Sequence, residues 1–192
     1  MPPKIKVTQD QIILAAMDIV RESGIDALNA RALAKHLDCS IQPIFKNFET
    51  MGSLKQALLV EAQKIYDAYT QKGMENPNPF LGIGLGYIQF AQEEKNLFKL
   101  LFMTNEFKQT SLIQIIKEDE NQEVVKLVSQ LSGLSLVLSE QLFIDVWLIT
   151  HGIASMCATN DIDLSLDEVT TILRDAFAGF KHQLLKEKET HA

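Results

Sequence analysis

The chain has 192 residues, of which 46% are hydrophobic and 22% charged, so we expect a folded protein with an apolar core rather than a disordered chain. Its net charge of −7 is unevenly spread: residues 1–72 carry nine Lys or Arg against eight Asp or Glu, and residues 73–192 carry nine against seventeen. This asymmetry permits an anionic partner at the N-terminal part and argues against one elsewhere.

Several features favour a cytoplasmic protein without a bound metal or cofactor. The opening stretch MPPKIKVTQD has no apolar run after its lysines, so no signal peptide is expected. The longest apolar runs are interrupted by Glu140 and Asp145, well short of a membrane span. Cys39 and Cys157 are isolated, which fits a reducing compartment with neither a disulfide nor a metal knuckle.

The first predicted helix begins at Thr8, where Gln11 follows three residues later in a capping-box pattern. Gly24 is the expected C-terminal cap of this helix. The inward apolar stripe, at helical spacing, is formed by Ile12, Ala16 and Val20.

Two short helices are predicted next. Asn29 is the expected N-cap of the second helix, and Asp38 suits a tight left-handed turn after it. Ser40 is the predicted N-cap of the third helix, which makes Pro43 its third helical residue. A proline is tolerated there because the first four amide groups of a helix have no internal partner.

The rest of the chain also predicts helices, so the fold class is all-α. A long helix is expected over residues 51–73, and the NPNP stretch at 76–79 marks a break. Long apolar helices follow, the last opening at a second capping box formed by Ser165 and Glu168. We therefore predict two domains, one at residues 4–50 and a second, also helical, at residues 51–192.

The layout of helix, helix, tight turn and short helix is that of a helix-turn-helix, in which the third helix enters the DNA major groove. From residue 12 to residue 48 the chain resembles the DNA-binding domain of TetR family regulators, through IILAAMDIVRESG, NARALAKHLDCS and IQPIFKNF. The resemblance implies a dimeric regulator of the repressor type that binds a palindromic operator and releases it with a small apolar or amphipathic effector. It makes residues 4–50 the DNA-binding domain and residues 51–192 a helical effector-binding and dimerisation domain.

Three positions depart from the family pattern. Asp38 replaces the usual glycine of the turn, Phe45 replaces a tyrosine that bonds a phosphate, and Met51 replaces a lysine near the start of the fourth helix. Two phosphate contacts are therefore missing, and the non-specific electrostatic attraction to DNA should be smaller. The cations that can compensate are Arg31, Lys35, Lys46 and Lys55.

Gln42 is the candidate reader of a base, because a glutamine amide can bond adenine through two atoms in the major groove. Ile41 and Pro43 offer apolar contact to a thymine methyl group. The alternative is that Gln42 is simply an exposed polar residue at a helix start. The complete predicted DNA-binding set is Asn29, Arg31, Ser40, Ile41, Gln42, Pro43, Phe45, Lys46, Asn47 and Lys55.

The stretch DVWLITHGIASM resembles a Trp-x-x-x-His-Gly pattern in the C-terminal domains of one TetR subgroup. Trp147 and His151 are four residues apart and share a helix face. We predict a ligand chamber with His151 as its polar anchor; plain core packing is the alternative. The predicted chamber residues are Phe98, Phe102, Met103, Phe143, Trp147 and His151, with Met156 nearby.

A homodimer is predicted through the last two long helices, because their apolar stripes are too long to leave exposed on a monomer. Small residues around Gly179 would let a partner helix approach. The alternative is that the stripe packs within its own domain. The predicted interface residues are Leu142, Ile149, Ile153, Leu173, Phe177, Phe180 and Leu184.

An enzyme is not expected. Asp145, His151 and Cys157 lie in one predicted helix, but Cys157 is six residues from His151 and faces elsewhere, and the common nucleophile, phosphate-loop and zinc motifs are absent from the sequence. The more serious alternative is a helical dimeric interaction module in which DNA binding is weak or lost, given Phe45 and Met51.

Overall fold

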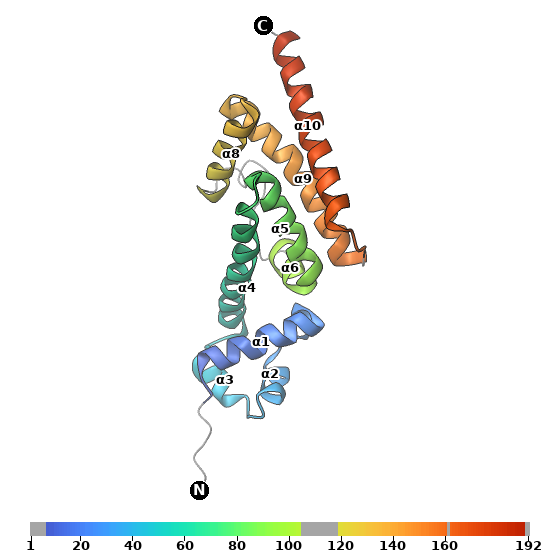
Figure 1. Ribbon diagram of the computed structural model, residues 1–192. Helices are drawn as coiled ribbons and strands as arrows, with labels where there is room; N and C mark the ends of the chain where they lie inside the picture. The colour runs from blue at the N-terminus through green and yellow to red at the C-terminus, as the bar shows by residue number, and fades with distance from the viewer. Residues whose placement is uncertain (1–6, 105–118, 161, 191–192) are drawn as a thin grey trace. The chain divides into compact units, whose positions relative to one another are not determined.

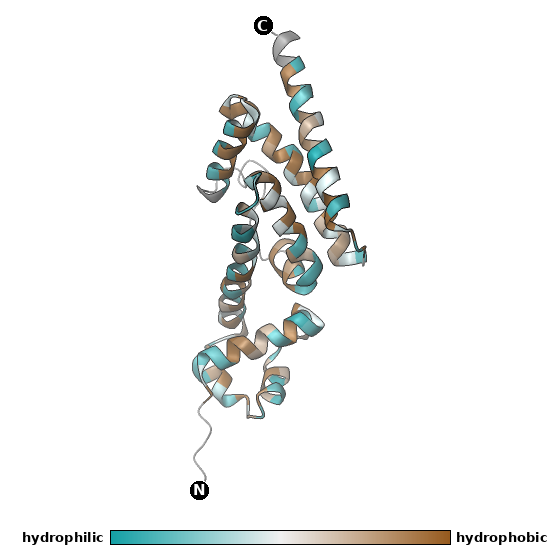
Figure 2. Ribbon diagram, in the orientation of Figure 1, coloured by the Kyte–Doolittle hydropathy of each residue, from teal (hydrophilic) through white to brown (hydrophobic). Residues whose placement is uncertain are grey.

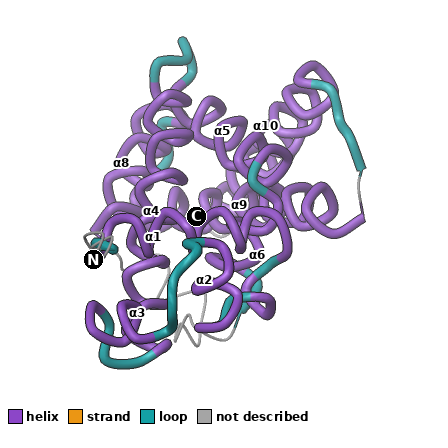
Figure 3. Tube along the Cα trace, turned by 90° about the horizontal axis from the view of Figure 1, so that it is seen from below, coloured by secondary structure: helices purple, strands orange, loops and turns teal. Residues whose placement is uncertain are grey.

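The computed structural model describes residues 7–104, 119–160 and 162–190, and within those ranges the regular elements are all helices (Figure 3). The predicted all-α class is confirmed. The chain divides into two compact units: Met1–Asp67 with Glu94–Glu106, and Ala68–Glu93 with Phe107–Ala192. The boundary expected at residue 50 thus falls inside the first unit.

The first unit opens with four short elements, α1 (Gln9–Ser23), the 3-10 helix η1 (Ile25–Ala27), α2 (Ala30–His36) and α3 (Gln42–Asn47), which follow one another in Figure 1. Thr8 caps α1 in the predicted capping box, accepting from the amide of Gln11 at 3.3 Å, while the Gln11 side chain accepts from the amide of Thr8 at 3.0 Å. Gly24 ends α1 as expected.

The turn between α2 and α3 confirms two predictions and corrects a third. Asn29 caps α2, and Asp38 adopts a left-handed conformation with φ +48°. Ser40, however, is not the N-cap of α3: that position is Ile41, and no side chain caps it. Pro43 is therefore the second helical residue, still within the turn where its missing amide costs no hydrogen bond.

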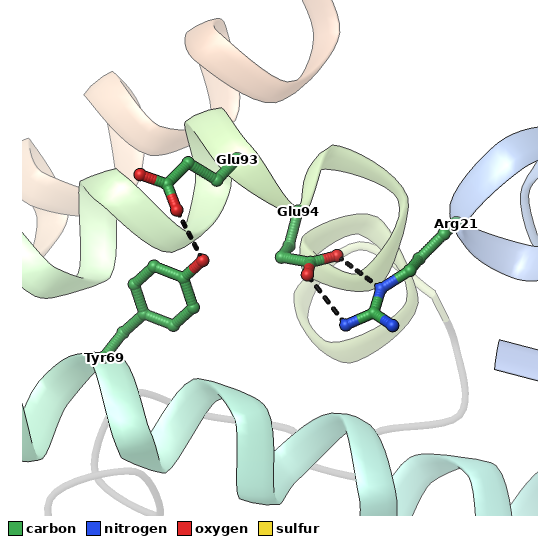
Figure 4. A network of polar contacts seen from close by, with 4 residues as sticks. All are labelled: Arg21, Tyr69, Glu93 and Glu94. Carbon is green, nitrogen blue, oxygen red and sulfur yellow. Dashed lines mark hydrogen bonds and ion pairs between the residues drawn. The ribbon is translucent and has the colours of Figure 1, made fainter. Parts of the chain in front are cut away.

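Two further helices contribute to the first unit, α4 (Met51–Met74) through its residues up to 67, and α6 (Lys95–Phe102). α6 packs against α1. Arg21 of α1 donates to both carboxylate oxygens of Glu94, at 2.9 and 2.8 Å, and Asn96 Nδ2 donates to the Arg21 carbonyl at 2.8 Å. The paired bonds of Arg21 and Glu94 are drawn in Figure 4 and fix the start of α6 on α1.

The second unit contains the end of α4 together with α5 (Pro79–Glu93), α8 (Asp119–Ser132), α9 (Leu136–Asn160) and α10 (Leu166–Thr190). The break predicted at NPNP separates α4 from α5. Helix α9 contacts α5, α8 and α10 and is the central helix of this unit. The predicted capping box at the start of α10 is also confirmed, because Ser165 and Glu168 bond one another.

α9 is the one helix of the described residues whose length and apolar composition would suffice to cross a membrane. Figure 2 shows it hydrophobic over most of its turns, whereas α10 alternates between hydrophilic and hydrophobic residues. Its surroundings explain part of this composition: α5, α8 and α10 contact it, and Leu142, Phe143 and Val146 are buried in the core of the unit. Its most apolar stretch is 39% buried, and large apolar side chains such as Leu148 and Met156 are exposed.

The end of α4 approaches α5 so closely that only glycine fits. A Cβ atom on Gly82 would overlap the backbone carbonyl of Gly73, and a Cβ on Gly73 would overlap that of Gly82. One turn further along α5, a Cβ on Gly86 would overlap the carbonyl of Tyr69. Backbone contact thus explains Gly82 and Gly86 of GIGLG, whereas a Cβ on the intervening Gly84 would meet the side chain of Leu173 at 3.1 Å. Tyr69 also donates to Glu93 at 2.6 Å, the second bond drawn in Figure 4.

Candidate nucleic-acid interface

Helix α3 has an inward face and an outward face set by helical spacing. Ile44 and Phe48 are four residues apart and are both buried in the first unit. Gln42 and Lys46, also four apart, are exposed. The predicted base reader and the predicted phosphate contact therefore lie on the outward face, as a helix that enters a groove requires.

The outward face also carries two large apolar side chains. Ile41 is 47% exposed and Phe45 is 44% exposed, and they too are four residues apart. Because residues 41, 42, 45 and 46 are related by spacings of one, three and four, they form one continuous surface on α3. We call these four residues the α3 surface.

Two of the predicted DNA contacts have structural partners. Asn29 Oδ1 accepts from the amides of Arg31 and Ala32, at 3.1 and 3.0 Å, which satisfies two of the unpaired donors at the start of α2. Asn47 Nδ2 donates to the carbonyls of Pro43 and Val7, at 2.8 and 3.2 Å. Asn47 thus ties the segment before α1 to the end of α3.

The remaining predicted DNA contacts are accessible to different degrees. Arg31 and Ser40 are exposed, and Pro43 and Lys55 are half-buried. Residues 29–47 contain three basic side chains, Arg31, Lys35 and Lys46, against the single acidic Asp38, a net charge of +2 in a chain whose total is −7. This segment is therefore locally positive in a chain that is negative as a whole.

The residues of the predicted ligand chamber divide between the two units. Phe98, Phe102 and Met103 belong to the first unit, where the rings of Phe98 and Phe102 lie 5.1 Å apart. Phe143, Trp147 and His151 belong to the second unit, where Phe143 is part of the buried core.

A compact aromatic cluster surrounds His151 in the second unit. Its ring stacks on that of Trp147, with centroids 5.1 Å apart and planes inclined by 14°. Its Nδ1 atom is 2.8 Å from the hydroxyl of Tyr87, a buried residue of α5. Desolvation by burial lowers the pKa of His151, so the imidazole is neutral at pH 7. The predicted polar anchor thus already has a partner, which the sequence reasoning missed.

The predicted dimer residues fall into two groups. Leu142, Leu173, Leu184 and Ile153 are buried within their own unit, and Phe177 and Phe180 are half-buried against it. Ile149 is 37% exposed. Other large apolar side chains on α9 and α10 are exposed as well, namely Leu148, Met156, Ile172 and Leu185. A Cβ atom on Gly152 or Gly179 would meet no atom within 4 Å, so contacts within the described chain do not require glycine at either position.

Within the described residues, no group of three or more His, Cys, Asp or Glu side chains is placed to hold a metal ion.

No protein-family model matches the sequence. YobS of Bacillus subtilis (strain 168), an uncharacterised HTH-type transcriptional regulator, is 22% identical over 134 residues. That match covers 68% of this chain and 66% of YobS, so the chain spans slightly less than two thirds of this relative.

Two solved structures cover nearly the whole chain. A protein with unknown function from Rhodococcus sp. RHA1 matches with a TM-score of 0.68 and 19% identity, over 95% of this chain and 98% of that protein. A protein from Vibrio parahaemolyticus, described as a TetR family transcriptional regulator, matches with a TM-score of 0.60 and 18% identity, over 89% and 97%. This likeness establishes the fold, an all-helical arrangement of the TetR-like kind.

Proposed function

We propose that the protein is a transcriptional regulator of the TetR type that binds a palindromic operator in the cytoplasm as a homodimer. The observation that carries the proposal is the α3 surface: Gln42 and Lys46 point outward from a helix whose other face, Ile44 and Phe48, is anchored in the core. A rigid scaffold behind an exposed polar face is what base reading in the major groove needs. The likeness in fold to a TetR family protein supports the same function.

The first test is selection of a binding site, followed by two variants. The full chain is mixed with duplexes that contain a randomised segment, and the recovered sequence is titrated by fluorescence anisotropy. Gln42→Ala should cost about 1–3 kcal/mol and relax the preference at one base position. Lys46→Ala should weaken binding to all sequences alike and lower the dependence on salt.

A matched control is Lys126→Ala, which removes an exposed lysine of the second unit that pairs with Glu123. It should leave DNA binding unchanged. Equal losses on every sequence for Gln42→Ala would contradict its role as a base reader.

We propose that two chains associate through exposed apolar side chains of α9 and α10. Leu148, Gly152 and Met156 are four residues apart on α9 and exposed, and Gly152 leaves space for a partner helix. Because Gly152 has no side chain, the backbone of a partner helix can approach α9 closely at this position. Since Leu173 and Leu184 are buried in their own unit, they would support this surface from behind rather than form it.

The dimer is tested by sedimentation of Leu148→Glu combined with Met156→Glu. Both side chains are exposed, so the variant should remain folded and become monomeric. Persistence of a dimer of wild-type stability would place the interface elsewhere.

We propose that a small apolar or amphipathic effector binds near Trp147 and His151, as in the subgroup with the Trp-x-x-x-His-Gly pattern, and releases the operator. Both side chains are only half-buried, so they can contact a ligand as well as one another. Trp147 is the only tryptophan, so its fluorescence should report binding directly. The test is to screen apolar and amphipathic compounds for quenching of Trp147 fluorescence and to measure DNA binding with those that quench it. A compound that quenches Trp147 without weakening DNA binding would contradict the link between the two sites.

A second candidate function is that of a helical dimeric interaction module without DNA binding. The observation that favours it is Phe45, which has no hydroxyl to bond a phosphate and is exposed together with Ile41. Recovery of no duplex in the selection would support this function.

A further inference from the structure

We propose that Ile41 and Phe45 read thymine methyl groups, so that the operator half-site presents A·T pairs to α3. This inference rests on the proposed function and adds to it a second specificity residue, Phe45. The sequence placed Phe45 in the predicted DNA-binding set without the phosphate bond that a tyrosine makes, and thymine contact was expected of Ile41 and Pro43.

Ile41 and Phe45 form an exposed apolar pair. Within residues 7–50, the large hydrophobic side chains exposed in the structure are Leu14, Ile41 and Phe45, and two of these three lie one turn apart, at the N-cap of α3 and within that helix. Ile44 and Phe48 lie on the opposite side and are buried in the core, so Ile41 and Phe45 do not turn inward. Exposure of both apolar side chains on one face points to a partner that covers them.

The chemistry of the partner follows from the polar residues around the pair. Gln42 and Lys46 complete the α3 surface, and residues 29–47 carry a net charge of +2. Positively charged surroundings attract a polyanion, and a glutamine amide can hydrogen-bond the major-groove edge of adenine. The thymine methyl is the apolar group that the major groove offers beside that edge, and phenylalanine and aliphatic side chains are suited to contact it. The occupant that matches all four side chains is a duplex with A·T pairs.

Pro43 contributes less to this surface than the sequence suggested. It is half-buried as the second residue of α3, whereas Ile41 and Phe45 are both more than 40% exposed. The apolar contact therefore runs along one turn of α3, from Ile41 to Phe45, on either side of Gln42.

The test compares the duplex that the full chain recovers from the randomised pool with the same duplex made with deoxyuridine in place of thymidine. Deoxyuridine lacks only the methyl group, so base pairing and charge are unchanged. Wild-type protein should bind the deoxyuridine duplex about fourfold more weakly for each methyl group that Ile41 and Phe45 cover. This factor corresponds to the transfer free energy of one buried carbon. Phe45→Ala and Ile41→Ala should each reduce the ratio of the two dissociation constants, deoxyuridine duplex over thymidine duplex, toward one.

Leu14→Ala is the matched control, because it removes an exposed apolar side chain of the same unit from α1, outside the α3 surface. It should leave the ratio at the wild-type value, and circular dichroism should show all three variants to be equally helical. Equal affinity of the wild type for both duplexes, or an unchanged ratio in Phe45→Ala, would overturn the inference while leaving the proposed function intact. If no duplex is recovered at all, the proposed function and this inference both fail.

Discussion

Replacement of Gly82 by alanine should destabilise the second unit, although alanine is the better helix former. In a helix position without steric conflict, glycine to alanine gains about 0.5–1 kcal/mol. At Gly82 the added Cβ would overlap the backbone carbonyl of Gly73, and backbone cannot move aside by a change of rotamer. Overpacking of this kind costs about 1–3 kcal/mol, and the rigidity of both helices places Gly82→Ala in the upper part of that range.

Gly152 supplies the matched comparison, since it lies in α9 of the same unit and a Cβ there would meet nothing within 4 Å. Gly152→Ala should therefore raise the free energy of unfolding slightly, by up to about 1 kcal/mol. The helix gain applies to both variants, so their free energies of unfolding should differ by the overpacking cost alone, about 2–3 kcal/mol.

The assay is urea unfolding followed by the fluorescence of Trp147, which lies in the second unit and so reports its loss of structure. Measurement at several protein concentrations separates an effect of Gly152→Ala on association from one on the folded chain. If Gly82→Ala is as stable as Gly152→Ala, the backbone contact between α4 and α5 is not as close as the structure has it, and the explanation of these glycines is wrong.

Substitutions at three other contacts provide separate tests. Asn29→Ala should lower the free energy of unfolding by about 0.5–2 kcal/mol in urea titrations, because the cap accepts two amide hydrogen bonds, whereas Asn29→Asp should retain most of it. His151 has a lowered pKa in the folded state, so the unfolded chain binds the proton more tightly; stability should fall as pH drops below about 6.5, and His151→Asn should flatten that slope. Arg21→Ala and Glu94→Gln should each cost about 0.5–1 kcal/mol, with a positive coupling in a double-mutant cycle, because the pair is bidentate but partly exposed.

Local signals in the sequence predicted most of the helix boundaries. Thr8, Asn29 and Ser165 each cap a helix as expected, because a side-chain oxygen at the first turn bonds nearby amides regardless of distant packing. The prediction that Ser40 is the N-cap of α3 was wrong, and the reason is informative. A serine can cap only if the helix begins directly after it, and α3 begins at Gln42 with Ile41 as its N-cap.

The contacts that join distant segments were beyond sequence reasoning. His151 was singled out as a polar anchor, but its partner Tyr87 is 64 residues away, and no local pattern pairs them. A tyrosine amid apolar residues in GYIQF was the available hint, since a buried hydroxyl needs a partner. The stripe of α10 shows the same limit: periodicity indicates an apolar face, but not whether that face packs within its own unit, as Leu173 and Leu184 do.

The central claim is that the α3 surfaces of two chains read two halves of one duplex. The most direct measurement is sedimentation velocity of the full chain with the duplex it selects from a randomised pool, together with the sequence of that duplex. We expect an inverted repeat with half-sites about one helical turn apart, bound by an even number of chains, and loss of the complex when Gln42→Ala and Lys46→Ala are combined. A selected sequence without two-fold symmetry, or a complex unaffected by these substitutions, would contradict it.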